Sequence, residues 1–314
     1  MDKITSRAVV GEFKRALEVA TPPSWVGMTA NTFQSDQASE EYPWLSSTPA
    51  LREWVGGRNA KGFTENAISI RNRHFEATLE LLVCDMRRDK FGMIQARVND
   101  LVKRAMTHPA SLLSALMIAG ESTNCYDGQW FFDTDHSEGD SGSQSNDLAI
   151  TIANLPAILH GIATAPSVEE MQGAIAAAIA AMMGFKDSAG EPMNEDASSF
   201  LVMVPTPYYN TAMQAVATPM QVAASQTVLS ALKSDFNIQA VVNPRLTWTT
   251  KFAVFRTDSY IKPFIFQKET AINIGAKAEG SEFEFDNDAH QYGVDYWGNV
   301  AYGLWQHACL VTLS

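Results

Sequence analysis

The stretch from residue 125 to residue 136 constrains the fold most, because aromatic, acidic and sulfur-containing side chains crowd into a few consecutive positions. It reads Cys-Tyr-Asp-Gly-Gln-Trp-Phe-Phe-Asp-Thr-Asp-His. A helical pattern ends just before it at Gly120, and a polar run over 137–147 follows it. This setting favours a rigid aromatic turn that leads the chain out of one domain and into another. The chemical alternative is a divalent metal held by Asp133, Asp135 and His136, with Cys125 as a nucleophile.

The composition is that of a soluble globular protein. A length of 314 residues fits about two domains, since single domains run to roughly 100–200 residues. Hydrophobic residues make up 46% of the chain and charged residues 18%, which argues against a disordered or membrane-embedded class. The net charge of −12 argues against a nucleic-acid-binding surface, which needs a basic patch.

Cysteine usage and hydropathy give further expectations about the compartment. The three cysteines form no Cys-x-x-Cys pair, so neither a disulfide framework nor a zinc site is expected. The N-terminus lacks the apolar segment of a signal peptide, and no apolar run reaches the roughly 18–20 residues of a membrane span. We therefore expect a soluble, intracellular protein with no membrane partner.

Residues 1–82 predict an arm followed by an extended segment. Val9, Phe13 and Leu17 recur at helical spacing within 6–20, and the prolines after Thr21 end that helix. From 28 to 82 nothing resembles a long helix, and two extended runs are expected, at 28–33 and 68–83.

The region between these two extended runs is rich in aromatic residues but has little local core. Tyr42, Trp44 and Trp54 lie there. A segment of this kind is typically functional or is ordered by a partner, and the alternative is a loop that folds back on its own domain.

Two adjoining helices are predicted next, over 88–107 and 109–119. The first carries an apolar stripe that includes Ile94, Val98 and Val102, and Pro109 is expected to end it. The second is apolar nearly all round and should be buried, with Gly120 after its last turn. A half-exposed helix joined to a buried one provides the backbone of a domain.

The rest of the chain alternates helices and strands and then becomes rich in strands. Ser167 and Glu170 form a capping box for a helix that closes at Gly184. Buried strands are predicted at 200–204, 238–242 and 252–255, and a further helix at 208–217. This alternation predicts a compact α/β domain over 150–256. Further strands are expected in the tail, packed on the helix at 88–107: 262–268, 271–274, 283–285 and 301–313.

No catalytic constellation emerges from the motifs. The chain has no Gly-x-Ser-x-Gly, no phosphate-binding glycine loop and no His-Glu-x-x-His. The pair Asp133 and Asp135 with His136 lacks a distant third element to fix a metal geometry, so a structural role is favoured. Cys125 has no identifiable histidine partner to activate it. We expect no enzyme activity, no catalytic residue, no metal and no cofactor; the arm and the aromatic segment point to an assembly subunit.

Five segments, in the same order, resemble the Mu-like phage major head subunit. The first is Tyr42-Pro43-Trp44-Leu45, followed by Pro49, Leu51-Arg52-Glu53-Trp54-Val55-Gly56 and Arg58. The second is the stretch at 125–136 described above. The others are Asn243-Pro244-Arg245-Leu246, Lys262-Pro263-Phe264-Ile265-Phe266-Gln267 and Tyr302-Gly303-Leu304-Trp305-Gln306. Together they extend over most of the chain.

This resemblance implies an α+β protein with the Hong Kong 97-type capsid fold. On that basis residues 1–27 are expected to form an N-terminal arm, and 28–82 an extended loop that reaches over a neighbour. Residues 83–122 and 258–314 would form the peripheral domain, with a spine helix at about 88–107. Residues 123–257 would form the axial domain.

The resemblance also implies a function and partners. The expected protein is a major capsid protein of a tailed bacteriophage or prophage, assembled in the host bacterial cytoplasm. It would build hexamers and pentamers of an icosahedral shell that encloses double-stranded DNA without sequence-specific binding. A separate scaffold, a portal and a decoration protein are expected partners. An encapsulin-like shell protein and a metal-dependent hydrolase using Asp133, Asp135 and His136 are the alternatives.

Two sets of residues are expected to matter for assembly. Inter-subunit contacts are expected from aromatic, apolar and arginine side chains of the extended loop: Tyr42, Trp44, Leu45, Arg52, Trp54 and Arg58. The junction between the axial and peripheral domains is expected to be held by packed rings and by carboxylates that fix the turn: Tyr126, Trp130, Phe131, Phe132, Asp133, Asp135 and His136.

Overall fold

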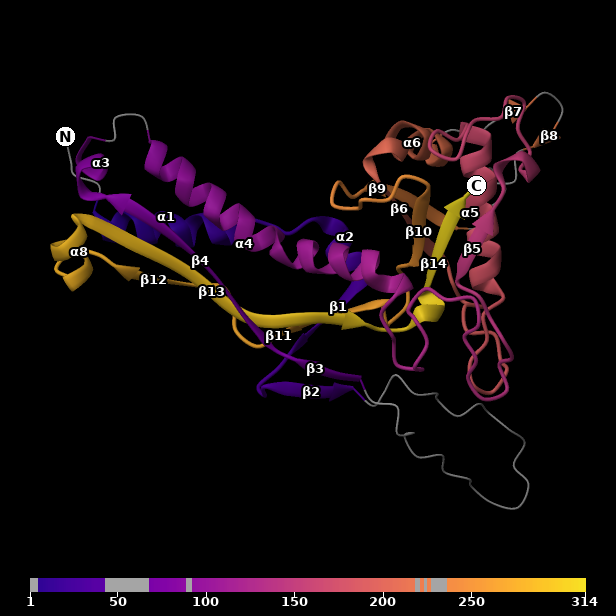
Figure 1. Ribbon diagram of the computed structural model, residues 1–314, viewed down its shortest axis with the longest axis horizontal. Coiled ribbons are helices and arrows are strands. Elements are labelled where there is room, and N and C mark those ends of the chain that lie inside the picture. Colours follow the sequence, from indigo (N-terminus) through magenta and orange to yellow (C-terminus); the bar gives the residue numbers. More distant parts are fainter. Residues whose placement is uncertain (1–4, 43–67, 89–91, 218–220, 223–224, 227–235) are drawn as a thin grey trace, which may run out of the picture.

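The 26-residue helix α4 (Met93–Ile118) runs along an elongated molecule and ends beside a second body (Figure 1). The computed structural model describes residues 5–42, 68–88, 92–217, 221–222, 225–226 and 236–314. Two five-stranded sheets organise these residues, one along the length of α4 and one at its C-terminal end. The fold is therefore a mixture of helices and strands, as the sequence predicts.

The helices and strands follow one another along the chain with bounds that differ in places from those predicted. Before α4 they are α1 (Ser6–Val19), α2 (Ser24–Thr29), β1 (Ala30–Gln34), β2 (Ser39–Tyr42), β3 (Ile68–Arg71), β4 (Arg73–Leu82) and α3 (Val83–Arg88). After α4 come β5 (Asp147–Ile150), α5 (Val168–Met183), β6 (Ser199–Val204), α6 (Tyr209–Ala217), β7 (Gln221–Val222), β8 (Ser225–Gln226), β9 (Asn237–Val242) and β10 (Lys251–Arg256). The remaining elements are β11 (Phe264–Lys268), β12 (Asn273–Lys277), α8 (Glu282–Asn287), β13 (Ala289–Tyr302) and β14 (Ala308–Leu313).

The first sheet is built around the long strand β13. Its N-terminal half pairs antiparallel with β4 and with β12, and its C-terminal half pairs antiparallel with β11. Strand β1 joins the far side of β11 in parallel, so that Ala30 lies opposite Phe264. Early and late parts of the chain thus share one sheet.

Helices α1 and α4 cover this sheet through a small apolar cluster. Val9 and Phe13 of α1 pack with Val98 and Val102 of α4 and with Tyr292 of β13. All five side chains are buried, because each helix presents one apolar stripe to the other and to the sheet. The predicted N-terminal helix is confirmed, and the side chain of Thr5 caps it by accepting from the Ala8 N–H.

The second sheet has the order β5-β14-β10-β6-β9. Helix α5 packs against β14 and β10, and α6 packs against β6, β9 and α5. The capping box of Ser167 and Glu170 at the start of α5 is present as predicted. Strands β6 and β10 are almost wholly buried, which explains why they read as continuous apolar runs in the sequence.

The predicted break at Pro109 is wrong: α4 continues through it, and Gly92 precedes the helix as its cap. Proline has no N–H to donate and crowds the preceding turn, which normally ends or kinks a helix. Buried side chains on both sides hold the two halves together, among them Val102, Leu113 and Met117. Burial on both flanks therefore outweighs the local cost at Pro109.

The tail also differs from the prediction in two places. Residues 283–285, predicted as a strand, belong to helix α8, whose start is capped by Ser281 accepting from the Glu284 N–H at 3.2 Å. Residues 301–313, predicted as one strand, contain the end of β13, a short 3-10 turn (Trp305–His307) and β14. Strand β14 pairs with β10 and β5, so it lies in the second sheet and not beside the other tail strands.

No helix in the described part of the chain combines the length and the apolar character needed to cross a membrane.

Candidate functional site

The stretch at 125–136 lies where the two sheets meet, between the end of α4 and strand β5. Phe131 and Phe132 are fully buried and pack edge to face, with ring centroids 4.9 Å apart. Phe131 also stacks on Tyr302 of β13 at 4.5 Å and lies 5.2 Å from Phe264 of β11. Phe264 and Tyr302 are cross-strand partners in the first sheet. The aromatic pair thus fastens the stretch to the end of that sheet.

Gly120 allows this packing because it has no side chain. A Cβ atom at this position would lie 2.6 Å from Cδ2 of Phe132, closer than real carbon contacts allow. The backbone approaches equally closely, since the Phe132 N–H donates to the Gly120 carbonyl at 2.9 Å. The glycine after the last turn of α4 therefore ends the helix and also leaves room for the ring of Phe132.

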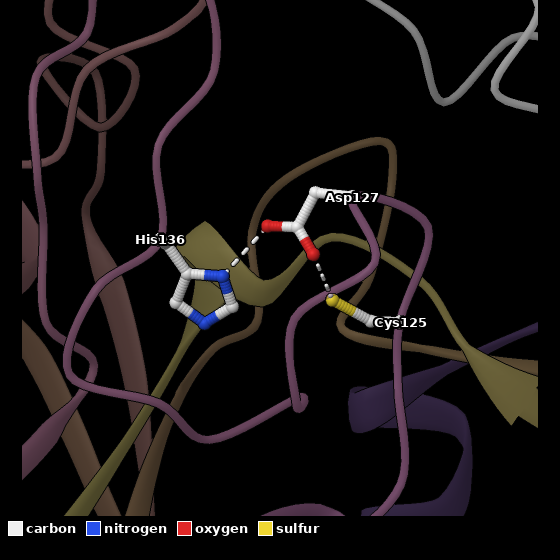
Figure 2. Close-up of side chains that lie close together, drawn as sticks. All are labelled: Cys125, Asp127 and His136. Carbon is white, nitrogen blue, oxygen red and sulfur yellow. Dashed lines mark hydrogen bonds and ion pairs between the residues drawn. The ribbon is translucent and has the colours of Figure 1, made fainter.

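The carboxylate of Asp127 is the centre of the polar part of the site (Figure 2). It accepts from Nδ1 of His136 at 2.7 Å and from Sγ of Cys125 at 2.9 Å. The Gln129 N–H donates to it at 3.0 Å. Because a carboxylate only accepts, His136 carries its proton on Nδ1. Burial would raise the pKa of Asp127, and the hydrogen bonds from His136 and Cys125 outweigh it, so that the pKa is lowered.

His136 stacks face to face on Trp305, with ring centroids 4.0 Å apart and an angle of 7° between the planes. The histidine side chain is completely buried, and so is that of the tryptophan. Nε2 of His136 and Nε1 of Trp305 have no hydrogen-bond partner among the described residues. The single bond to Asp127 is therefore what compensates the buried imidazole.

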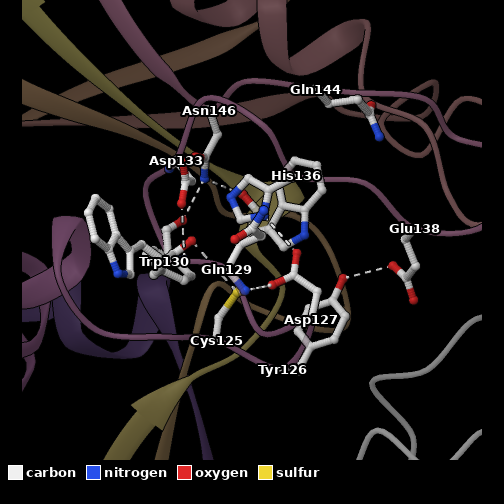
Figure 3. Close-up of polar contacts among 12 residues, drawn as sticks. Cys125, Tyr126, Asp127, Gln129, Trp130, Asp133, His136, Glu138, Gln144 and Asn146 are labelled. Carbon is white, nitrogen blue, oxygen red and sulfur yellow. Dashed lines mark hydrogen bonds and ion pairs between the residues drawn. The ribbon is translucent and has the colours of Figure 1, made fainter.

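A fully buried asparagine, Asn146, joins the stretch to the second sheet (Figure 3). Its Oδ1 accepts from the Asp133 N–H at 2.9 Å, and its Nδ2 donates to the Phe131 carbonyl at 2.8 Å. Its backbone carbonyl accepts from the Leu310 N–H of β14 at 2.8 Å. One side chain thus satisfies backbone groups of a loop that would otherwise be buried without partners.

Tyr126 makes a third connection, to the turn before β14. Its hydroxyl accepts from Nε2 of Gln306 at 2.8 Å and donates to Oε2 of Glu138 at 3.2 Å. Burial raises the pKa of Tyr126 well above its ordinary value, and the nearby Glu138 carboxylate raises it further. The phenol therefore stays protonated and acts as a fixed link between the polar loop and the second sheet.

The other predicted junction residues lie closer to solvent. Asp133 caps its own turn, because its carboxylate accepts from the N–H groups of Trp130 and Thr134. Asp135 is exposed and accepts from Nε2 of Gln129 at 3.2 Å. Trp130 is 48% exposed, so it does not share the buried position of the two phenylalanines after it.

The geometry does not support a nucleophilic cysteine. The Cys125 thiol donates to Asp127 instead of lying against the histidine, so His136 takes no proton from it. Burial raises the pKa of Cys125, and the charge on Asp127 raises it further, which keeps the sulfur protonated.

The metal alternative based on Asp133, Asp135 and His136 also finds no support. Among the described residues, the group that brings metal-ligand atoms together is Cys125, Asp127 and His136. Its neighbouring ligand atoms are 2.7 and 2.9 Å apart and already share protons in hydrogen bonds. Asp133 and Asp135 direct their carboxylates to backbone and amide donors of the same turn. This arrangement fits a structural clamp.

Of the predicted inter-subunit residues, only Tyr42 lies within the described part. It is buried in its own subunit, and its hydroxyl donates to Oε1 of Gln267 at 2.9 Å. Gln267 is itself fully buried and donates to the Ile70 carbonyl and to Oδ1 of Asn72. These bonds tie the hairpin of β2 and β3 to strand β11. The others lie outside the described residues: Trp44, Leu45, Arg52, Trp54 and Arg58.

Sequence reasoning missed several residues of the site, notably Gly120, Asn146, Trp305 and Gln306. The sequence indicates Gly120 only as a helix terminator, and Trp305 and Gln306 only as part of a family motif. The contacts of Trp305 with His136 and of Gln306 with Tyr126 join distant parts of the chain, and such contacts leave no trace in local periodicity.

The fold is that of tailed-phage capsid subunits of the Hong Kong 97 type. One similar structure is the procapsid of bacteriophage JBD30, with a TM-score of 0.55 and 23% identity, covering 98% of this chain and 76% of that chain. The chain belongs to the family of the Mu-like prophage major head subunit gpT, whose model matches residues 3–156 and 233–312. Members of this family are structural head proteins and not enzymes.

Two curated relatives share part of the chain. The Mu-like prophage FluMu major head subunit of Haemophilus influenzae is 32% identical over 133 residues, which are 42% of this chain and 43% of that protein. The major capsid protein of Escherichia phage Mu is 34% identical over 125 residues, which are 40% of each chain. The alignments thus span less than half of the length of either relative.

Proposed function

We propose that this chain is the major capsid subunit of a Mu-like phage or prophage. Copies of it would assemble through hexamers and pentamers into an icosahedral shell around double-stranded DNA, as part of the virion. The observation that carries the proposal is the family match, which extends over most of the chain and includes strands of both sheets. The fold shared with the JBD30 procapsid supports it.

The parts of the subunit would divide this work. Residues 1–27 would be the N-terminal arm and 28–82 the extended loop. Residues 83–122 and 258–314 would form the peripheral domain, and 123–257 the axial domain. The pairing of β14 with β10 and β5 supports one change, in which 308–313 serve the axial part. The site at 125–136 would hold the two domains at a fixed angle, so that subunits present matching edges.

The extended loop would contact a neighbouring subunit. Trp44, Arg52 and Trp54 are the anchors we propose, since aromatic and arginine side chains dominate interface energies, and Leu45 and Arg58 would flank them. Tyr42 would act from within its own subunit, because its buried hydrogen bond to Gln267 fixes the root of the hairpin.

Other phage components would complete the particle. We propose a separate scaffold, a portal and a decoration protein as partners, with assembly in the host bacterial cytoplasm. The acidic chain, with its net charge of −12, would enclose DNA without sequence-specific contacts. A surface that does not grip the polymer lets it move during packaging.

The test is a hairpin replacement designed from the pairing of β2 with β3. Tyr42 lies directly opposite Ile68, so an Asn-Gly turn can join them in place of 43–67 without changing the register. We expect the unaltered chain to form shells or rings in negative-stain electron microscopy, and the shortened chain to stay folded and monomeric. An unaltered chain that associates neither by itself nor with a coexpressed scaffold would overturn the proposed function. Shells from the shortened chain would overturn only the role of the loop.

A further inference from the structure

A short apolar loop between β5 and α5 carries large side chains that face solvent. Ile158 is 71% exposed, Leu159 79% and Ile162 64%. The segment 155–166 contains no Asp, Glu, Lys or Arg, although charged residues make up 18% of the chain. Three bulky apolar side chains so close together are more than the scattered exposure that soluble surfaces normally show.

A buried glutamate holds this loop in one conformation. The side chain of Glu170 is fully buried, and its carboxylate accepts from the Gly161 N–H at 3.1 Å and from the Ser167 N–H at 2.7 Å. Nδ1 of His160 lies 2.9 Å from Oε1 of the same carboxylate. Glu170 therefore serves the loop as well as the capping box at the start of α5.

Two further contacts fix the turn of the loop. A Cβ atom on Gly161 would lie 2.4 Å from the Ala165 carbonyl oxygen, so only glycine fits between the two arms. Ile162 and Ala165 form a β-bridge, and the hydroxyl of Tyr208 donates to the Ala163 carbonyl. A loop tied this firmly loses little conformational entropy when it binds, which is what a docking surface requires.

We propose that the apolar loop, with Ile158, Leu159 and Ile162 at its tip, is a contact through which one copy of this chain binds a second copy. The proposal rests on the proposed function, because a shell of identical subunits brings copies of this chain together. The absence of charged side chains within 155–166 argues for an apolar counterpart, since a charged partner surface would lose its hydration without gaining an ion pair; the carboxylate of Glu169 beside the loop already accepts from the Ile158 N–H.

The test compares two substitutions that add the same charge to the same loop. Leu159→Asp places a carboxylate at the apolar tip, whereas Thr164→Asp adds one at an exposed polar position. Leu159→Met keeps the side chain apolar and similar in volume. Sedimentation velocity over a range of subunit concentrations gives the association of each purified variant, and circular dichroism melting shows that each is folded.

We expect Leu159→Asp to raise the concentration at which assemblies appear by at least about tenfold. The proposed interface would lose the burial of the leucine side chain and would have to desolvate a charge. Leu159→Met and Thr164→Asp should assemble like the unaltered chain. Normal assembly of Leu159→Asp, or an equal defect in Thr164→Asp, would overturn this contact and leave the proposed function intact. Failure of the unaltered chain to associate, both by itself and with a coexpressed scaffold, would overturn both.

Discussion

Replacing Asp127 by alanine should destabilise the subunit strongly, because the buried His136 then loses its hydrogen-bond acceptor. The histidine side chain is 0% exposed and that of Asp127 is 3% exposed. Each buried donor that loses its acceptor costs about 1–3 kcal/mol, and Asp127 accepts from three of them: Nδ1 of His136, Sγ of Cys125 and the Gln129 N–H. Nε2 of His136 has no partner within the described residues, so the ring has no second bond to rely on. For the three donors together we expect a loss of about 3–5 kcal/mol in the free energy of unfolding.

Urea unfolding of the unassembled subunit, followed by near-ultraviolet circular dichroism, measures this loss. The stacking of His136 on Trp305 places an aromatic reporter directly on the site. Asp135→Ala is the matched control, because this exposed carboxylate accepts one bond at 3.2 Å and should change stability by no more than about 0.5 kcal/mol. Asp127→Asn keeps an acceptor without the charge and should fall between the two.

The reasoning is refuted if Asp127→Ala costs less than about 1 kcal/mol, or if Asp135→Ala costs as much. A midpoint shift at unchanged m-value would mean that stability alone has changed. The sign of the pH effect follows from the lowered pKa of Asp127. The stability that this carboxylate contributes is fully present above the pKa of the same carboxyl in the unfolded chain. It is lost as the pH falls through the lower pKa of the folded subunit. Asp127→Ala should therefore show a weaker loss of stability on acidification than the unaltered chain.

Three further predictions concern other contacts. Gly120→Ala should destabilise the subunit by about 1–3 kcal/mol, because its Cβ would overlap the ring of the fully buried Phe132; an unchanged melting temperature would contradict this. Gln267→Leu should increase hydrogen exchange in the β2–β3 hairpin before it changes exchange in the second sheet, since its buried amide ties that hairpin to β11; uniform exchange would exclude this role. Burial would raise the pKa of Glu279, but the hydrogen bond from the Ser6 N–H lowers it overall. Protection of the start of α1 from hydrogen exchange should therefore be lost as the pH falls below 4.5, and it should be absent at neutral pH in Glu279→Ala. Full protection in Glu279→Ala would refute this role.

The sequence predicted those elements in which the buried residues recur at one regular spacing. The stripe of α1 and the capping box of α5 were both readable, because each depends on residues within a turn or two. Pro109 shows the limit, since its local effect was outweighed by buried side chains on both sides. The misassigned segment at 283–285 had a local signal, as Ser281 and Glu284 are spaced like a capped helix start.

The candidate site was only partly predictable for a different reason. The stretch at 125–136 was recognisable as a rigid turn, and Phe131 and Phe132 are buried within it. The acid that holds His136 is Asp127, nine positions away, and not the adjacent Asp135. Which carboxylate faces the ring depends on how the turn folds back on itself. The stacking partner, Trp305, is supplied by a distant part of the chain.

The position of β14 sets the order in which the subunit becomes complete. It lies between β5 and β10, so until residues 308–313 have been synthesised β5 has no partner strand and β10 is paired on one side only, with β6. The long strand β13 and the ring of Trp305 also come late in the chain. A nascent chain leaving the ribosome therefore carries an open sheet and an unclosed junction, even though most of its helices have formed. Association with neighbouring subunits would therefore have to wait until translation is complete, because a partly synthesised subunit lacks the surfaces that would contact them.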